Sequence, residues 1–297
     1  MVHICEQYSV DWKFKFNPQK SIQLYFTNSL RKKDILLYGS CIPVETSAKH
    51  VGVLLNTKFN SMDRTLRACR TLRSSAIGLI KSGLHPSEIS VDICSRIIRQ
   101  VCFPKAFFGC ELWTEITNTE RLLLERAQRF VCKAIQGLPK QTRTDMCNSL
   151  LGWKSAEAYV DERKLLFLGQ LVTMKDSMLP KRIFLTRAME IKYNCINSQR
   201  GFIPDIHRIL TKYELLDFDT YLSSGYFPAY IQWKKKVQFA VQKLEEYLGV
   251  TEHYWTMTLD SLNVYIRCQM DITLHGVLVE FTQDLKNTVV SLLTYVH

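Results

Sequence analysis

The sequence predicts a mainly α-helical chain with a small N-terminal antiparallel β unit, which is an α+β fold. From Ser61 onward, apolar residues recur at spacings of three and four, the period of a helix face. Short apolar runs broken by Gly, Asn and Pro fill residues 12–55, as in small hairpins. Hydrophobic residues make up 46% and charged residues 23% of the 297 residues. This composition is typical of folded globular chains.

The β unit is predicted from alternation and turn residues. Residues 12–16 alternate strictly, which predicts a strand with aromatic side chains on one face and Lys13 and Lys15 on the other. Gly39-Ser40, with Gly first, predicts a two-residue type II′ hairpin turn. The other elements expected here are the end of a helix at 3–10 and strands at 22–26, 35–38, 41–44 and 49–55.

Helix signals dominate the rest of the chain. Ser61 suits the N-cap of a first helix. Pro86 suits the first turn of a second helix, which should end before Pro104. Residues 117–120 have the pattern of a capping box, and Gly137 marks the end of that third helix. Further helices are expected at 156–174 and near 205–216, 228–248 and 258–293.

Positive charge is concentrated in the first third of the chain. The whole sequence carries a net charge of +11, and residues 1–110 alone hold 16 basic and 7 acidic side chains, a net of +9. Such asymmetry favours a polyanionic partner, with nucleic acid ahead of an acidic membrane surface; a basic surface without a partner is the alternative. No stretch approaches the roughly 18 apolar residues of a membrane helix. We therefore expect no membrane partner and an intracellular protein, in the nucleus or cytoplasm, with reduced thiols.

The first long helix carries a basic row. Arg64, Arg67, Arg70 and Arg73 recur every three residues, and no acid interrupts that face. On a helix such a row drifts by about 60° per step and covers half of the cylinder. The guanidinium groups could follow a phosphate backbone, and a merely solvated face is the competing interpretation. The predicted nucleic-acid-binding set is completed by Lys13, Lys15, Lys20 and Lys58. The Lys234–Lys236 run, with acids downstream, suits a solvated face instead.

Five segments, in order, resemble the end of the palm and the thumb of reverse transcriptases from LINE-type (non-LTR) retrotransposons. They are Trp12–Ser21, Lys49–Leu55, Gly109–Trp113, Ile135–Pro139 and Leu150–Trp153. In the second segment, His50 and Val51 replace the family's usual aromatic-Leu pair. The resemblance covers about residues 1–175 and implies RNA-directed DNA polymerase ancestry. It implies a truncated palm remnant at 1–58 and a thumb-like domain at 59–175, and it leaves 176–297 as a helical region of unknown role.

The resemblance also implies which catalytic parts to look for. An intact family member holds Mg²⁺ with palm aspartates that precede the segment matching Trp12–Ser21. We expect these aspartates to be missing, so no catalytic residue, metal ligand or cofactor is assigned. Tyr159–Glu162 mimics the aspartate turn but follows the thumb segments and has helical flanks, and Asp217-Phe218-Asp219 suits a solvated turn. Lys20 matches a family lysine near the triphosphate, and a turn lysine in solvent is the competing interpretation. The ten cysteines lack the spacing of zinc ligands.

The leading interpretation is a truncated reverse-transcriptase-like protein that binds nucleic acid but does not polymerise alone. One alternative is a split polymerase subunit whose missing palm comes from another chain. A structural or interaction protein, or a relic without function, is the other alternative. A neighbouring reading frame that encodes the aspartate turn would favour the split subunit.

We expect the purified chain to show no primer extension on an RNA template with Mg²⁺ or Mn²⁺, because two metal ions need paired aspartates to hold them. A radiolabelled nucleotide incorporation assay tests this. Template-dependent incorporation that disappears on Asp161→Asn would contradict the expectation and would place the metal site in the Tyr159–Glu162 segment.

Overall fold

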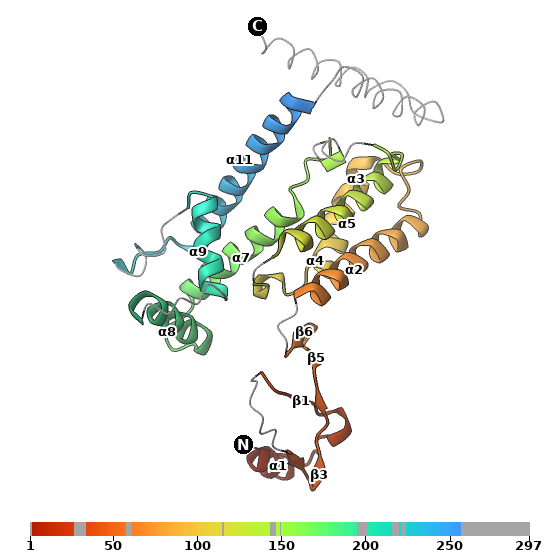
Figure 1. The fold of residues 1–297 in the computed structure, drawn as a ribbon. Coiled ribbons are helices and arrows are strands. Elements are labelled where there is room, and N and C mark those ends of the chain that lie inside the picture. The colour runs from red at the N-terminus through yellow and green to blue at the C-terminus, as the bar shows by residue number, and fades with distance from the viewer. Residues whose placement is uncertain are drawn as a thin grey trace.

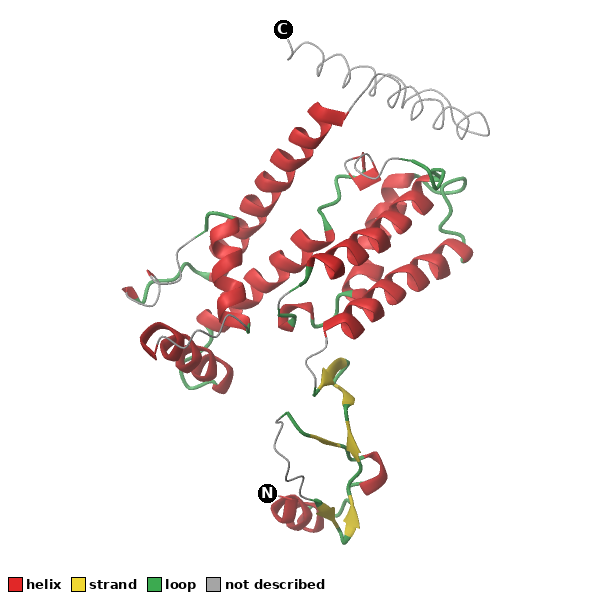
Figure 2. Ribbon diagram, viewed as in Figure 1, coloured by secondary structure: helices red, strands yellow, loops and turns green. Residues whose placement is uncertain are grey.

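The computed structural model describes residues 2–26, 34–57, 61–114, 116–142, 147–148, 150–194, 201–215, 220 and 224–256. It contains an N-terminal unit, which holds all the described strands, and a larger helical body (Figure 2). In Figure 1 the N-terminal unit lies beyond the first turn of helix α2, apart from the other helices. The predicted fold class, mainly α with a small β unit, is confirmed.

The N-terminal unit is thin and has little core. Its elements are α1 (Val2–Asp11), a 3₁₀ turn (Pro18–Lys20), β1 (Gln23–Leu24), β2 (Leu36–Leu37), β3 (Ser40–Cys41), β4 (Val44–Glu45), β5 (Ser47–His50) and β6 (Val53–Asn56). The pairs β2–β3 and β5–β6 are antiparallel, as predicted for this unit. The β1–β4 pair is parallel, with Gln23 opposite Val44, so the antiparallel prediction is wrong for this pair. Among the described residues of this unit, Leu37 is the one large apolar side chain that is buried.

The strand predicted at residues 12–16 is wrong. Helix α1 continues to Asp11, and Lys13 then adopts a left-handed conformation with φ of 58°. The chain folds back on the helix end, where the Phe14 amide donates to the Ser9 carbonyl at 3.0 Å. The amides of Trp12, Lys13 and Phe14 therefore donate to α1 instead of to a neighbouring strand.

The first hairpin exists, but its turn lies one residue earlier than predicted. Leu37 pairs with Ser40, so the turn residues are Tyr38 and Gly39. Both have positive φ, 49° and 75°, as a type I′ turn requires in place of the expected type II′. The Tyr38 amide donates to Glu6 Oε1 of α1 at 2.6 Å, and this contact fixes the turn from outside the hairpin.

The single strand expected over 49–55 is a second hairpin, β5–β6. It turns at Val51 and Gly52, where φ is 46° and 85°. A side chain at Gly52 would come within 2.8 Å of the Phe108 ring, so glycine allows the turn to approach the helical body. Positive φ at a β-branched residue such as Val51 is rare and marks local strain.

The helical body agrees with the predicted helices in most places. It consists of α2 (Ser61–Lys81), α3 (Val91–Ile97), a π-helical turn (Ile98–Cys102), α4 (Phe103–Ala106), a 3₁₀ turn (Cys110–Leu112), α5 (Asn118–Gln136), α7 (Ala156–Thr173), α8 (Leu179–Asn194), α9 (Phe202–Lys212) and α11 (Tyr230–Thr256). Helix α8 was not predicted. The helix expected near 258–293 lies outside the described residues.

The second predicted helix differs at both ends. It begins at Val91, because residues 86–88 form a turn in which the Glu88 amide donates to the His85 carbonyl at 2.9 Å. It does not end before Pro104, because a π-helical turn leads directly into α4. Pro104 lies in the first turn of α4, a position where proline is tolerated in a helix.

Both ends of α5 follow the predicted signals. The Thr117 amide donates to Glu120 Oε2 at 2.9 Å, and the Glu120 amide donates to Thr117 Oγ1 at 3.3 Å, which completes the capping box. At the other end Gly137 has φ of 64°, and the Leu138 amide donates to the Lys133 carbonyl at 2.9 Å. This is the bonding pattern of a Schellman motif.

Within the described residues, buried side chains form two core clusters, and α7 contributes to both. The first cluster lies among α2, α3, α4 and α5. It receives Cys110, Trp113, Ile135, Leu138 and Trp153 from the segments that resemble the thumb. The second cluster packs α7 against α8, α9 and α11 around Trp233, which is 1% exposed. Helix α7 gives Val160 to the first cluster and Leu165 and Leu168 to the second.

We expect Gly169→Ala to destabilise the helical body by about 1–3 kcal/mol, because a methyl group there would overlap the buried Trp233 ring. Gly78→Ala, at an exposed site of α2 with open space around it, is the matched control. That variant should gain about 0.5–1 kcal/mol from helix propensity. Urea unfolding followed by circular dichroism measures both, and equal stabilities for the two variants would contradict this account of the α7–α11 contact.

Candidate nucleic-acid interface

Helix α2 packs on α5, and this contact decides which side chains of α2 face solvent. The two helices run in the same direction: Thr65 Oγ1 donates to Glu120 Oε1 at 2.9 Å, and further along the Cys69 thiol donates to the Leu123 carbonyl at 3.4 Å. Residues Ala68, Cys69, Leu72 and Ala76 of α2 are buried. The opposite side of α2 therefore carries the arginine row.

The structure separates Arg64 from the other three arginines. Its guanidinium donates to the Thr114 carbonyl and lies over the Trp113 ring, 5.6 Å from the centroid. Burial lowers the pKa of Arg64 from its ordinary value, against the opposing influence of Glu120. Arg64 thus belongs to the packing between α2 and the segment before α5, in contrast to the surface contact expected from its spacing.

Arg67, Arg70 and Arg73 are exposed. The Arg73 guanidinium lies 5.6 Å from the ring centroid of Phe130, which is on the outer face of α5. Arg126 lies one turn before Phe130 and is also exposed. We call Arg67, Arg70, Arg73 and Arg126 the basic face. In the described part of the chain, no ion pair joins any member of the basic face to an acid.

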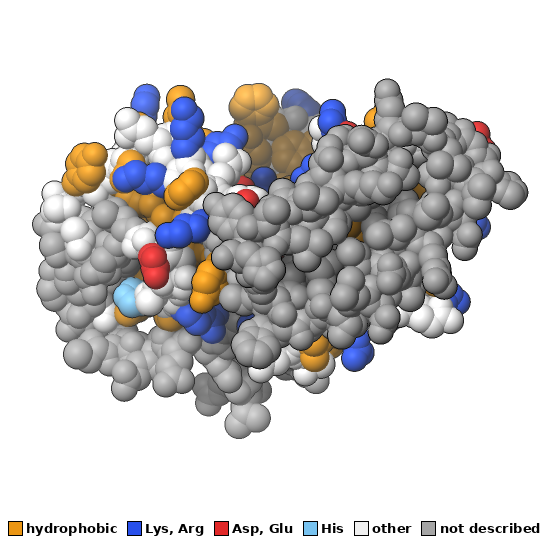
Figure 3. Space-filling model, turned by 90° about the horizontal axis from the view of Figure 1, so that it is seen from above, with side chains coloured by type: hydrophobic (Ala, Val, Ile, Leu, Met, Phe, Trp, Pro, Cys, Tyr) orange, Lys and Arg blue, Asp and Glu red, His pale blue; other side chains and the backbone are white. Residues whose placement is uncertain are grey.

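Basic side chains are not confined to α2. Figure 3 shows Lys and Arg side chains spread among apolar ones on the described part of one face of the molecule. Lys234, Lys235 and Lys236 on α11 are exposed as well. Exposed basic side chains therefore do not by themselves set α2 apart from helices such as α11. What sets α2 apart is the regular spacing of its arginines without ion pairs to described residues.

The predicted lysines lie away from the basic face. Lys13, Lys15 and Lys20 are exposed in the N-terminal unit, and the Lys15 ammonium lies 5.1 Å from the centroid of the Tyr38 ring. Lys20 ends the 3₁₀ turn, where its amide donates to Asn17 Oδ1. Lys58 is outside the described residues. The predicted set thus divides between two surfaces, one on α2 and one on the N-terminal unit (Figure 1).

The aspartate of the Tyr159–Glu162 segment, Asp161, is buried and hydrogen-bonded within the fold. The segment is part of helix α7, and Asp161 Oδ2 accepts hydrogen bonds from Lys212 Nζ at 2.8 Å and from the Tyr213 hydroxyl at 3.1 Å. Burial raises the pKa of Asp161, and Lys212 opposes that shift. The Asp217-Phe218-Asp219 segment lies outside the described residues. Within the described ranges, no three His, Cys, Asp or Glu side chains come together as metal ligands would.

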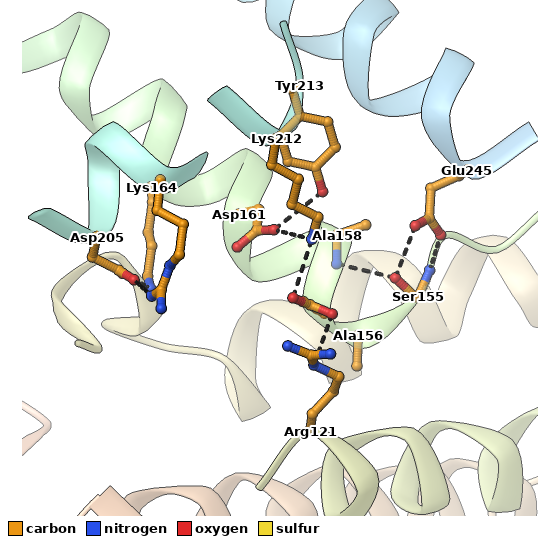
Figure 4. A network of polar contacts seen from close by, with 12 residues as sticks. Arg121, Ser155, Ala156, Ala158, Asp161, Lys164, Asp205, Lys212, Tyr213 and Glu245 are labelled. Atoms are coloured by element: carbon orange, nitrogen blue, oxygen red, sulfur yellow. Dashed lines mark hydrogen bonds and ion pairs between the residues drawn. The ribbon is translucent and has the colours of Figure 1, made fainter. Parts of the chain in front are cut away.

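Asp161 belongs to a network of polar contacts that joins four helices (Figure 4). Lys212 of α9 also donates to Glu157 at 3.1 Å, and Glu157 pairs with Arg121 of α5 at 2.9 Å. Glu245 of α11 accepts from the Ser155 amide and hydroxyl, at 2.6 and 3.0 Å. These contacts hold α5, α9 and α11 to α7.

A second ion pair of α7 lies deeper. Lys164 Nζ is 2.5 Å from Asp205 Oδ2 of α9, and both side chains are at most 3% exposed. Asp205 also accepts from Arg208. Sequence reasoning missed this pair, and its one local signal was a charged residue among the apolar positions of α7. Separating α7 from α9 at this pair is costly, because a buried charge that loses its partner is left uncompensated.

Comparison with known protein families, with curated proteins and with solved structures finds no match. Among the described helices, none combines the length and the apolar character needed to cross a membrane.

Glu120 gives the α2–α5 contact a pH dependence. Its carboxylate is buried, which by itself would raise its pKa, but hydrogen bonds from Thr117, Ser61 and Thr65 outweigh burial and hold the pKa below its ordinary value. Because the folded pKa lies below the unfolded one, the carboxylate stabilises the fold at neutral pH. That contribution is lost as the pH falls through the folded pKa.

We expect Glu120→Gln, which keeps the side-chain shape, to lower the free energy of unfolding at neutral pH by about 1–3 kcal/mol. The difference from the parent should shrink as the pH falls below the ordinary glutamate pKa of 4.5 and through the lower pKa of the folded state, because the parent carboxylate then becomes protonated. Urea unfolding across this pH range measures the effect. Glu88→Gln, which removes an exposed carboxylate, is the control and should leave the stability within about 0.5 kcal/mol at every pH. A constant difference for Glu120→Gln would contradict the proposed ionisation.

Proposed function

We propose that the chain binds nucleic acid through the basic face, as a thumb-like region of a protein derived from a LINE-type reverse transcriptase. The observation that carries this proposal is the row Arg67, Arg70 and Arg73, exposed at every third position and free of internal acid partners within the described residues. Over that row the helix rises by about 9 Å, so the charges suit a run of phosphates better than a single anion.

The treatment of other arginines supports the proposal. Among the other described arginines outside α2, an ion pair with a carboxylate is found for Arg96, Arg121, Arg163, Arg187 and Arg208, but not for Arg99, Arg126, Arg129 and Arg182. The Arg163 guanidinium, for example, contacts Glu111 Oε1 at 2.5 Å. The lack of an ion pair is therefore not peculiar to α2; its distinct feature is that, within the described ranges, three exposed arginines without one recur at every third position of a single helix.

The chemistry of the face favours backbone contacts without base reading. Guanidinium groups bind phosphate oxygens through paired N–H donors, and phosphate contacts position a protein without reading sequence. Phe130, beneath Arg73, holds one guanidinium against the protein and restricts its motion. We propose an RNA, DNA or RNA–DNA partner, a nuclear or cytoplasmic location, and no polymerisation by this chain alone.

Changing Arg67, Arg70 and Arg73 together to Gln should weaken duplex binding and reduce its salt dependence. The slope of log affinity against log salt is negative, and each lost phosphate contact reduces its magnitude by about 0.7–0.9. Loss of three contacts should therefore make the slope shallower by about 2–3. Glutamine preserves helix propensity, so the variant should stay folded. Fluorescence anisotropy with an RNA–DNA duplex at several salt concentrations, with circular dichroism of each variant, measures both effects.

The matched control changes Lys234, Lys235 and Lys236 to Gln, which removes the same number of exposed charges from α11. This control should change the slope much less. A second comparison is Arg64→Gln, which should reduce stability more than affinity because Arg64 packs against Trp113. If the triple arginine variant binds the duplex as tightly as the parent, the row is only a solvated helix face and the proposal is wrong.

A further inference from the structure

Four aromatic rings form a continuous exposed row on the N-terminal unit. The Tyr8 ring lies 5.9 Å from Trp12 and 6.0 Å from Phe14, and Phe14 lies 5.0 Å from Phe16, all between centroids. Trp12 is 68% exposed, Tyr8 53%, Phe14 42% and Phe16 38%. These rings thus contact one another while each keeps a large part of its surface in solvent, which is unusual for a contiguous aromatic group. We call them the aromatic row.

The backbone holds the aromatic row in place without a core. The Trp12 amide donates to the Tyr8 carbonyl at 3.1 Å, which continues α1 by one bond. The left-handed Lys13 then reverses the chain, and the Phe16 amide donates to the Tyr38 hydroxyl at 3.3 Å. That hydroxyl also lies 2.5 Å from Ser9 Oγ of α1. The rings are therefore oriented before any ligand arrives.

Lysines alternate with the rings. Lys13 and Lys15 lie between the aromatic residues at 12, 14 and 16, and both are exposed. Within the described residues no acid pairs with either of them. Of the two acids of α1, Glu6 accepts from the Tyr38 amide and lies 3.5 Å from His3 Nδ1, and Asp11 is exposed. The two lysines and the two acids of α1 balance in number, so the feature specific to the row is that its rings are interleaved in sequence with two exposed lysines.

We propose that the aromatic row is a stacking site for the unpaired bases of single-stranded nucleic acid, with Lys13 and Lys15 contacting its phosphates. Exposed rings alternating with cations are the pattern by which proteins hold single strands, because every base has a face that can stack. Protein–protein interfaces are also rich in aromatic side chains but are depleted in lysine, so it is the presence of Lys13 and Lys15 between the rings that favours nucleic acid over a polypeptide partner. This inference rests on the proposed nucleic-acid function but uses a different surface and a different form of the ligand.

Two substitutions of Trp12 separate stacking from simple apolar contact. Trp12→Phe keeps an aromatic face, whereas Trp12→Leu keeps apolar surface without one. Fluorescence anisotropy with labelled oligo-dT and oligo-U strands should show about tenfold weaker binding for Trp12→Leu and a change below about threefold for Trp12→Phe. Both variants should bind a blunt RNA–DNA duplex like the parent and give the parent's circular dichroism spectrum, because Trp12 is not part of a core.

Phe239→Leu is the matched control, since Phe239 on α11 is 72% exposed and lies outside the aromatic row. It should change neither single-strand nor duplex binding. The inference is overturned if Trp12→Leu binds single strands like the parent, or if it loses single-strand and duplex binding equally. It is also overturned if Trp12→Phe loses as much as Trp12→Leu, or if Trp12→Leu alters only self-association in sedimentation velocity.

The Arg67, Arg70 and Arg73 triple variant separates this inference from the proposed function. If that variant keeps full duplex affinity while Trp12→Leu still weakens single-strand binding, the basic face is not an interface and the stacking site stands. If the triple variant loses duplex binding and Trp12→Leu changes nothing, the proposed function stands and the stacking site does not.

Discussion

The buried carboxylate of Glu120 is the contact on which the proposed basic face depends. It closes the capping box of α5 through Thr117 and accepts from Thr65 of α2, so one side chain fixes the beginnings of both helices. Since α2 and α5 run side by side from that point, the rotation of α2 about its axis is set at its first turn. The same rotation that buries Leu72 and Ala76 directs Arg67, Arg70 and Arg73 to solvent.

Helix α7 has the corresponding role for the rest of the helical body. It supplies Val160 to one core and Leu165 and Leu168 to the other, and Trp233 Nε1 of α11 donates to the Leu165 carbonyl at 2.8 Å. The Lys164–Asp205 pair and the contacts around Asp161 add polar restraints to this apolar packing. Because an unpaired buried charge is costly, these pairs define the position of α9 against α7 more narrowly than apolar contacts alone.

The sequence predicts elements whose signals are local. Helix α5 begins and ends where Thr117 and Gly137 indicate, because the bonds that cap it involve residues within a few positions. Helix α8 escaped prediction since Pro180 suggests a break, although the first turn of a helix accepts proline. Features set by distant partners also escaped prediction. The turn at Tyr38 is fixed by Glu6, 32 positions away, and Arg64 is drawn inward by Thr114, 50 positions away. Rules based on the spacing of neighbouring residues cannot predict contacts between residues so far apart in the sequence.

The positive charge of the α2 row affects both the stability of the free chain and its affinity for the proposed ligand. Successive arginines of the α2 row are about 4.5 Å apart along the helix axis, well within the screening length of roughly 8 Å at physiological salt. Their mutual repulsion therefore disfavours the folded free chain, and no carboxylate among the described residues relieves it through an ion pair. A polyanion would remove that repulsion and release condensed counterions at the same time. The same positive charges thus destabilise the free helix face and provide the affinity for the proposed ligand. Ion pairs with carboxylates inside the fold would relieve the repulsion but would also weaken binding, and so would oppose the proposed function.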